Sequence, residues 1–322
     1  MKIRLPKASL RGSLRCSLLI ESDILAHMYT YSTIDSDKKL STLVQSWKQR
    51  DIISIAMDFE GEFNLHIYGE HLCLIQIFDG KEYFLIDPLK ISEEALKTFL
   101  EDPDLEKVMF DCASDSALVR KAYGVALAHA FDIRVQALAL DYTGNLTGLV
   151  ERHLGVQEEK STQSKKKNQM TNWLCRPLKE DQIQYALSDV ANLFALKTIL
   201  TKLIEEKGLT GQVHKTMLTA AKPKGPDKPG WTKFASWKYM NKEEKTYLKY
   251  FFQARDTMAK KYNVPAVRIL EKHRLLEMAK TIPGTANDFH IYCARCPQEQ
   301  VKELVGLLLE AKKSAALEML PA

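Results

Sequence analysis

The hydrophobic positions in the first two thirds of the chain follow two different periods. Several short stretches are apolar or alternate between apolar and polar residues, as β-strands do, and they lie at 29–34, 51–60, 72–79, 83–89 and 108–111. Between them lie segments with an apolar residue at every third or fourth position, which is typical of helices. Asp79-Gly80 is a turn signal between two of the strands, and Ser92 is suited to cap a helix. Strands interleaved with helices predict an α/β layered domain with a mixed sheet.

The pattern changes in the second half of the chain. Residues 179–208 are amphipathic throughout and are predicted to form one long helix that ends at Gly208. Residues 209–240 are rich in Pro, Gly and Lys, as linkers are. Asn241 is then suited to cap a helix, with Glu244 completing a capping box. We therefore expect four parts: an N-terminal appendage at 1–27, an α/β domain at 28–208, a linker at 209–240 and a small all-α bundle at 241–322.

The overall composition of the 322 residues is that of an ordinary globular protein. No stretch is long and apolar enough to cross a membrane, so no membrane association is expected. The N-terminal appendage holds five basic residues and no acid before Glu21, a composition that is also found in transit peptides. We expect a monomer without an organic cofactor.

The six cysteines are scattered and do not suggest a disulfide framework. They fit a reducing compartment, and a cytoplasmic location is expected. Cys293 and Cys296 form one CxxC preceded by His290, but a zinc site needs four ligands and no second pair is present. Reduced structural thiols are therefore expected at these two positions.

The net charge of +5 hides an asymmetry between two parts of the chain. Residues 207–322 hold 21 Lys and Arg against 11 Asp and Glu, whereas residues 1–206 hold 25 against 30. An acidic part joined to a basic part suggests chemistry in the first and binding of a polyanion in the second. The alternative is that the basic helices are simply solvated.

Two carboxylates end one of the predicted strands, in the stretch IAMDFEGEF. Asp58 and Glu60 are two positions apart, so both project from the same face of a strand. Two negative charges this close raise each other's pKa unless something positive offsets them. A lysine would serve one of them, whereas divalent cations would serve both, and oxygen ligands suit magnesium or manganese. An exposed pair without a ligand is the alternative.

Further acids lie where the predicted elements begin or end. Asp115 opens a helix, Asp132 ends a short strand, and Asp189 lies four residues after Tyr185 on the face of one helix. Each has a structural alternative. Asp115 would stabilise a helix N-terminus, Asp132 would be a cap, and Tyr185 would be a half-buried amphipathic side chain.

Four stretches together resemble the ribonuclease D family of 3′→5′ exonucleases: IAMDFEGEF, LCLIQIFDGKEYFLIDPL, VMFDCASDSALVRKAYGV and NWLCRPLKEDQIQYALSDVANL. The resemblance covers about residues 29–206 and keeps the order and spacing of the motifs. It implies a ribonuclease H-like mixed sheet with flanking helices. The basic segment from about 241 to 318 is similar to the HRDC domain that members of this family carry.

The resemblance implies the roles of five residues. Asp58, Glu60, Asp115 and Asp189 match the four acids that bind two divalent metal ions, Mg²⁺ or Mn²⁺. Tyr185 matches the tyrosine that orients the attacking water. The implied reaction removes nucleoside 5′-monophosphates from RNA with a single-stranded 3′ end, with tRNA precursors as the implied substrate.

Several residues near these motifs are predicted to contact the substrate. Lys165, Lys166 and Lys167 lie in a basic, polar segment and are expected to contact phosphates, with a solvated loop as the alternative. Arg176 is a similar candidate. Phe59, next to the metal ligands, is expected to pack on the terminal base or sugar.

The chain departs from its relatives at two positions. Many relatives have a histidine where this chain has Phe110, and an aspartate where it has Asn172. Neither is expected to be a metal ligand, so these differences bear on contacts to the substrate. Two other functions stay open: a 3′→5′ exonuclease acting on single-stranded DNA, and a nucleic-acid-binding protein with an inactive exonuclease domain.

Overall fold

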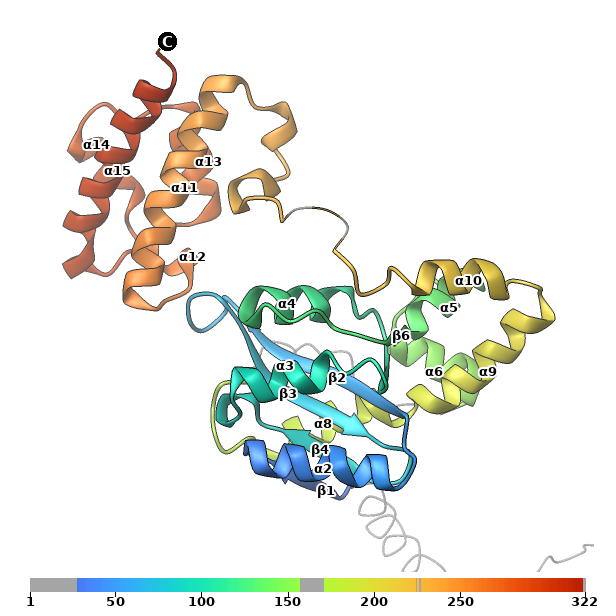
Figure 1. Cartoon of the computed structure of the whole chain (residues 1–322). Coiled ribbons are helices and arrows are strands. Elements are labelled where there is room, and N and C mark those ends of the chain that lie inside the picture. Colours follow the sequence, from blue (N-terminus) through green and yellow to red (C-terminus); the bar gives the residue numbers. More distant parts are fainter. Residues whose placement is uncertain (1–27, 157–170, 224, 226, 321–322) are drawn as a thin grey trace, which may run out of the picture.

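The computed structural model describes residues 28–156, 171–223, 225 and 227–320. In this part of the chain an α/β domain precedes an all-α bundle (Figure 1). No helix among these residues combines the length and the apolar character needed to span a bilayer.

Within the described residues, six strands form one mixed sheet with the order β1-β4-β3-β2-β5-β6. Their bounds are β1 Tyr31–Ile34, β2 Ser54–Phe63, β3 Glu70–Phe78, β4 Tyr83–Ile86, β5 Glu106–Met109 and β6 Ala130–Asp132. β3 is antiparallel to both β2 and β4, whereas β1 pairs parallel with β4, and β5 pairs parallel with β2 and β6. Gly80, in the predicted turn between β3 and β4, has a φ of 93°, which glycine adopts readily. The predicted α/β class and mixed sheet are confirmed.

Helices cover both faces of the sheet. The first face carries α2 (Asp37–Gln49), α3 (Glu93–Leu100) and α4 (Ala113–Tyr123), and the second carries α5 (Ile133–Ala139), α6 (Leu146–Leu154), α8 (Glu180–Ala191) and α9 (Leu193–Glu206). Along β2, Ile55 and Met57 enter the core on the first face, and Ala56 enters the core on the second. Because strand side chains alternate, Asp58 and Glu60 face the second set of helices.

The prediction of one long helix at 179–208 is wrong, because the chain breaks at Asn192 into α8 and α9. α8 packs against β2 and β3, whereas α9 packs against α5 and α6. Each half therefore buries its apolar side against a different part of the domain. Asparagine is a weak helix former and is suited to such a break.

The segment predicted as a linker carries structure at both ends. At its start, α10 (Thr210–Met217) packs against α5, α9 and β6, with Val213 buried. At its end, two 3-10 turns, η3 (Gly230–Lys233) and η4 (Trp237–Tyr239), lie against the bundle. The prediction missed these turns and α10 because Pro, Gly and Lys dominate the composition of the segment.

Five helices form the bundle: α11 Lys242–Tyr262, α12 Ala266–Ile269, α13 Lys272–Lys280, α14 Ala286–Tyr292 and α15 Gln298–Glu318. Asn241 and Glu244 form the predicted capping box at the start of α11. Cys293 and Cys296 are buried free thiols in the core of the bundle, and burial raises the pKa of Cys293 to about 12. A hydrogen bond of 2.7 Å from the Tyr68 hydroxyl, on the hairpin between β2 and β3, to Asp256 on α11 joins the bundle to the α/β domain.

Candidate active site

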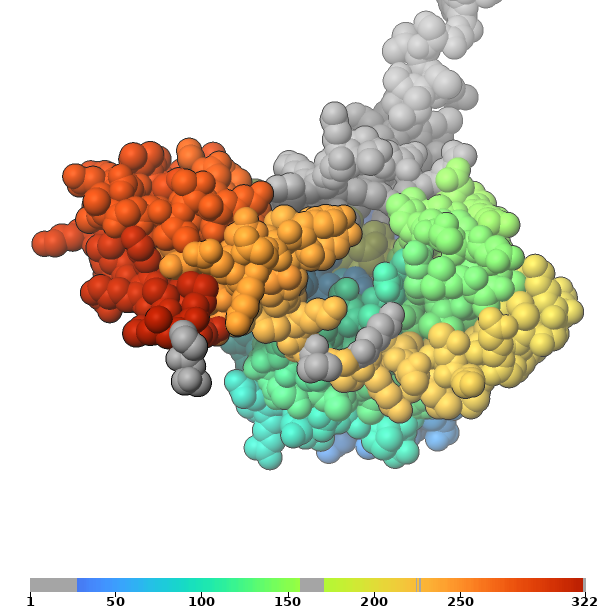
Figure 2. All heavy atoms as spheres, turned by 90° about the horizontal axis from the view of Figure 1, so that it is seen from above, coloured from blue at the N-terminus to red at the C-terminus, as the bar shows by residue number. Residues whose placement is uncertain are grey.

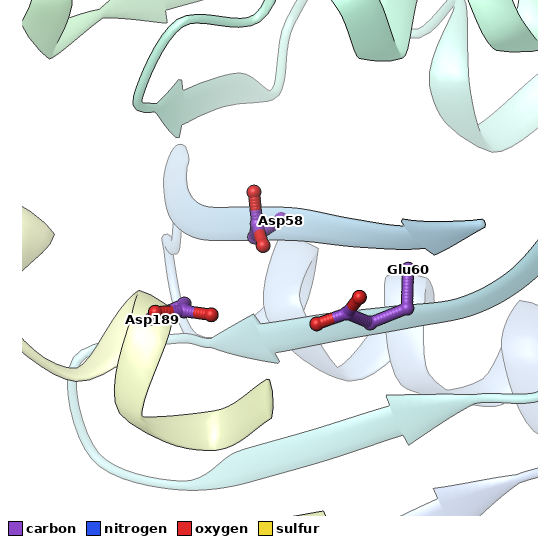
Figure 3. Close-up of side chains that lie close together, drawn as sticks. All are labelled: Asp58, Glu60 and Asp189. Carbon is purple, nitrogen blue, oxygen red and sulfur yellow. The ribbon is translucent and has the colours of Figure 1, made fainter. Parts of the chain in front are cut away.

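Three of the predicted acids come together on the second face of the sheet. Asp58 and Glu60 project from β2, and Asp189 projects from α8 toward them (Figure 3). One carboxylate oxygen of each residue lies within 4.8 Å of the oxygens of the other two. All three side chains are partly open to solvent. The group is therefore accessible to a ligand as well as compact.

A glutamine on the neighbouring strand supports this group and was missed from the sequence. Gln76 lies opposite Asp58 in the antiparallel pair of β2 and β3, and its side-chain amide donates a hydrogen bond of 2.8 Å to Asp58. Gln76 is fully buried. A polar residue in the apolar run LCLIQIF was the signal available in the sequence.

The electrostatics of the group are unfavourable when no cation is bound. Burial, followed by the nearby Asp115, raises the pKa of Asp58 well above its usual range. Burial also raises the pKa of Glu60 well above its usual range, with further contributions from Asp58, Asp189 and Asp115. Ionised carboxylates at this spacing need a positive charge between them.

Asp115 lies in the first turn of α4, beside the three carboxylates but outside the set whose oxygens lie within 4.8 Å of one another. Its pKa is raised to about 7, first by burial and then by the charges of Asp111 and Asp132. Its charge acts on both Asp58 and Glu60. Asp115 is therefore placed as an outer acid of the same site.

Asp132 is a helix cap, which was the structural alternative considered for it from the sequence. Its carboxylate accepts hydrogen bonds from the backbone N–H of Asp111 at 2.8 Å, Cys112 at 3.2 Å and Arg134 at 2.8 Å. It thereby caps α5 and fixes the loop that leads into α4. Asp132 positions Asp115 through that loop.

Tyr185 lies one turn before Asp189 on α8 and is 8% exposed. Its ring lies 6.4 Å from the ring of Trp173, at an interplanar angle of 34°. Trp173 is 1% exposed and belongs to the same apolar cluster as Tyr185. This packing restricts the rotation of the tyrosine ring.

The donor set fits a hard divalent cation. The group offers only carboxylate oxygens, the ligands that magnesium and manganese prefer. Among the residues that the structure describes, no lysine or arginine acts on the charges of Asp58 and Glu60. A bound cation would offset the mutual repulsion that raises these pKa values.

The predicted substrate contacts have different outcomes. The prediction that Phe59 packs on the terminal base or sugar is wrong. Phe59 is 7% exposed and lies in the core on the opposite face of the sheet, because neighbouring strand residues alternate. Lys165, Lys166 and Lys167 lie outside the described residues.

The positions at which this chain differs from many relatives also have local roles. Phe110 lies under the guanidinium of Arg134 at 5.6 Å, and the Asn172 side chain accepts a hydrogen bond of 3.0 Å from the Leu174 N–H.

Arg176 is engaged within the protein. Its guanidinium forms a two-pronged ion pair with Asp87, with distances of 3.0 and 2.8 Å. It also donates to the backbone carbonyls of Trp173 and Cys73, at 2.7 and 2.6 Å. These bonds satisfy the guanidinium group within the protein, so no phosphate is needed to explain its position. They also fix the loop that carries Trp173.

Known proteins resemble this chain in sequence. The profile of a family described as 3′-5′ exonuclease matches residues 31–205. Ribonuclease D of Gluconacetobacter diazotrophicus is 27% identical over 258 residues, which are 78% of this chain and 63% of the relative. Ribonuclease D of Escherichia coli is 30% identical over 184 residues, which are 56% of this chain and 46% of the relative.

Two solved structures share the fold. The structure of Escherichia coli RNase D superimposes with a TM-score of 0.70 and 24% identity, covering 91% of this chain and 76% of that one. The catalytic core of RRP6 from Trypanosoma brucei has a TM-score of 0.69 and 20% identity, covering 89% and 81%. The predicted fold class is thus confirmed. The chain spans less than two thirds of the length of the first of these curated relatives. The matched profile covers more than half of the sequence, and the chain belongs to the 3′-5′ exonuclease family.

Proposed function

We propose that this protein is a 3′→5′ exoribonuclease of the ribonuclease D type that uses two divalent metal ions, Mg²⁺ or Mn²⁺. The observation that carries the proposal is the grouping of Asp58, Glu60 and Asp189 within 4.8 Å, inside a region that matches the exonuclease family. The reaction hydrolyses the last phosphodiester bond of an RNA and releases a nucleoside 5′-monophosphate.

The residues of the site divide the work. Asp58, Glu60 and Asp189 hold the cations, and Asp115 contributes a fourth negative charge beside them. When bound, the divalent ions activate a water molecule and stabilise charge on the phosphate. Gln76 fixes the carboxylate of Asp58 in place, as outer groups commonly do at metal sites.

Tyr185 acts on the water molecule rather than on the metal ions. Two observations support this role: its ring packs against Trp173, and it lies one turn before Asp189 on α8. The hydroxyl orients the attacking water and assists removal of its proton. Pre-positioning of this kind lowers the entropy cost of the reaction.

The substrate is RNA with a single-stranded 3′ end, because only a free strand can bring its last phosphodiester among partly buried carboxylates. The names of the curated relatives favour RNA over DNA. Precursor tRNA is our proposed natural substrate. Contacts from Lys165, Lys166 and Lys167 to its phosphates, a monomeric state and a cytoplasmic location stay predictions.

The test compares 5′-labelled single-stranded RNA and DNA of one sequence, with Mg²⁺, with Mn²⁺ and with EDTA. We expect a ladder of RNA products shortened from the 3′ end, nucleoside 5′-monophosphates as the released product, and no cleavage in EDTA. The Asp189→Asn variant controls for contaminating nucleases. Faster cleavage of DNA would replace the proposal with a DNA exonuclease, and binding without cleavage under all conditions would indicate an inactive domain.

A further inference from the structure

The dipeptide Lys-Tyr occurs three times in the last third of the chain, and each time the two side chains adopt one arrangement. The lysine ammonium lies over the ring of the next residue, at 4.7 Å for Lys238-Tyr239, 4.8 Å for Lys249-Tyr250 and 5.1 Å for Lys261-Tyr262. Contacts of a cation with an aromatic face hold both side chains together. The pair presents an ammonium and a phenol O–H side by side.

In two of the three pairs a glutamate occupies this donor pair. Glu318 accepts a hydrogen bond of 2.5 Å from Lys249 and one of 2.8 Å from the Tyr250 hydroxyl. Glu303 accepts a hydrogen bond of 2.7 Å from Lys261 and one of 2.8 Å from the Tyr262 hydroxyl. The hydrogen bond from the lysine lowers the pKa of each glutamate. The protein thus uses Lys-Tyr twice as a receptor for an anion.

The third pair has no such anion. Among the residues that the structure describes, no acidic side chain forms a hydrogen bond or an ion pair with Lys238 or Tyr239. Tyr239 is 79% exposed. Of the acids nearby in sequence, Glu244 is engaged in the capping box of α11, and Glu243 is exposed. The same donors therefore face solvent and are available to an external anion.

More positive charge and aromatic surface surround this pair. Lys233 and Lys242 are exposed, and the ammonium of Lys245 lies 5.6 Å from the ring centre of Trp237. The 18 residues from 228 to 245 hold five lysines, four aromatic residues and two acids. This interleaving of cations and rings matches the chemistry of single-stranded nucleic acid, whose phosphates and bases need both.

The segment is anchored to the bundle. Trp231 and Phe234 meet the ring of Phe252 edge-on, at 5.9 and 6.2 Å between ring centres and at angles of 68° and 80°. The light-orange residues at the start of the bundle border a hollow between the bundle and the α/β domain on the face seen in Figure 2. A fixed surface loses less conformational entropy on binding than a mobile one.

We propose that Lys238 and Tyr239 form a binding site for single-stranded RNA outside the catalytic centre. A phosphate oxygen takes the place that Glu303 and Glu318 take in the other two pairs, and the exposed ring of Tyr239 stacks with a base. Lys245 and Trp237 extend the surface to a neighbouring nucleotide. The proposal rests on the proposed function, because it names the substrate strand as the occupant.

The test measures binding in the absence of chemistry. Full-length protein with Asp189→Asn, in EDTA, is titrated with a labelled single-stranded oligoribonucleotide at several salt concentrations. Against this background, Tyr239→Ala should raise Kd about tenfold through the loss of stacking. Tyr239→Phe should lose less RNA affinity than Tyr239→Ala, because the ring remains. Lys238→Gln should flatten the slope of log Kd against log salt by about 0.7, the share of one phosphate contact on a single strand.

Lys261→Gln is the matched control, because Lys261 has the same cation–ring geometry but already binds Glu303. It should leave Kd and the salt slope unchanged. Equal affinities for the Tyr239→Ala and parent proteins, with unchanged melting temperatures, would overturn the proposal. The proposal would also be overturned if these substitutions abolished binding of a labelled acidic peptide but left RNA binding unchanged. Because cleavage is not measured, RNA binding that depends on Tyr239 would stand even if the exonuclease assay failed.

Discussion

Gln76 and Asp58 face each other across two antiparallel strands and are joined by a hydrogen bond of 2.8 Å. The amide donor stabilises the ionised form of a carboxylate whose pKa burial raises. It also fixes the direction of the Asp58 oxygens relative to Glu60 and Asp189. Gln76 therefore acts as a positioning residue for the metal ligands.

Gln76→Leu should weaken metal binding about 10- to 100-fold, the usual effect of losing an outer partner at a metal site. The measurement is the Mg²⁺ concentration that gives half-maximal cleavage, together with direct titration of Mn²⁺. Gln136→Leu is the matched control, since Gln136 is equally buried but bonds Thr201 away from the site. Comparable metal affinity in both variants would remove Gln76 from the site.

Asp58→Asn should abolish turnover, lowering kcat/KM by at least about 10²-fold, because a metal ligand is lost. The same change removes one of several repelling charges. The melting temperature in EDTA should therefore equal or exceed that of the wild type. Asp189→Asn should behave in the same way. Activity within a few-fold of wild type would show that these carboxylates do not hold the metal.

Tyr185→Phe should lower kcat by about 10²- to 10⁴-fold, the usual contribution of a proton-transferring group. The ring keeps its packing against Trp173, so stability, metal affinity and RNA affinity should change little. Single-turnover cleavage and binding are measured on the same RNA. A variant that loses RNA affinity but keeps its chemical step would assign the hydroxyl to substrate positioning.

The stability of the metal-free protein should fall as pH rises from about 4 to about 7. Asp115 has a folded-state pKa raised to about 7, so in this range the folded protein holds a proton that the unfolded chain has released. Its stabilising contribution is complete below the unfolded pKa and is lost through pH 7. Asp58 and Glu60, whose pKa values are also raised, act in the same direction.

Saturating Mg²⁺ should offset this loss, so the rise in melting temperature on adding Mg²⁺ should be larger at pH 8 than at pH 5. Thermal melts with and without Mg²⁺ across this range provide the measurement. Asp115→Asn should flatten the profile of the metal-free protein. A metal-free profile that rises with pH would contradict the prediction.

Arg176→Gln should destabilise the fold by about 2–4 kcal/mol, because it leaves the nearly buried Asp87 without its partner. Chemical unfolding gives the size of the loss. KM for a short RNA should stay near wild type at a temperature where the variant is folded. A large rise in KM with unchanged stability would instead restore the phosphate contact first considered for this arginine.

The sequence by itself determined the features that depend on neighbours along the chain. Asp58 and Glu60 share a face because strands alternate, and Tyr185 and Asp189 share a face because helices repeat. Ser92 caps α3 and Asn241 caps α11 because a short polar side chain reaches the backbone a few residues ahead. The same alternation places Phe59 away from the metal ligands, although proximity in sequence suggested a contact.

Only the tertiary structure decided which distant residues meet. Asp189 reaches Asp58 because α8 packs across β2 and β3, and Arg176 is paired because Asp87 lies beside its loop. The sequence shows three identical Lys-Tyr dipeptides, but packing of α15 against α11 supplies a glutamate to two of them and leaves Lys238-Tyr239 open. Capping and periodicity depend on residues a few positions apart, whereas contacts between distant residues depend on how whole helices and strands bury their apolar sides.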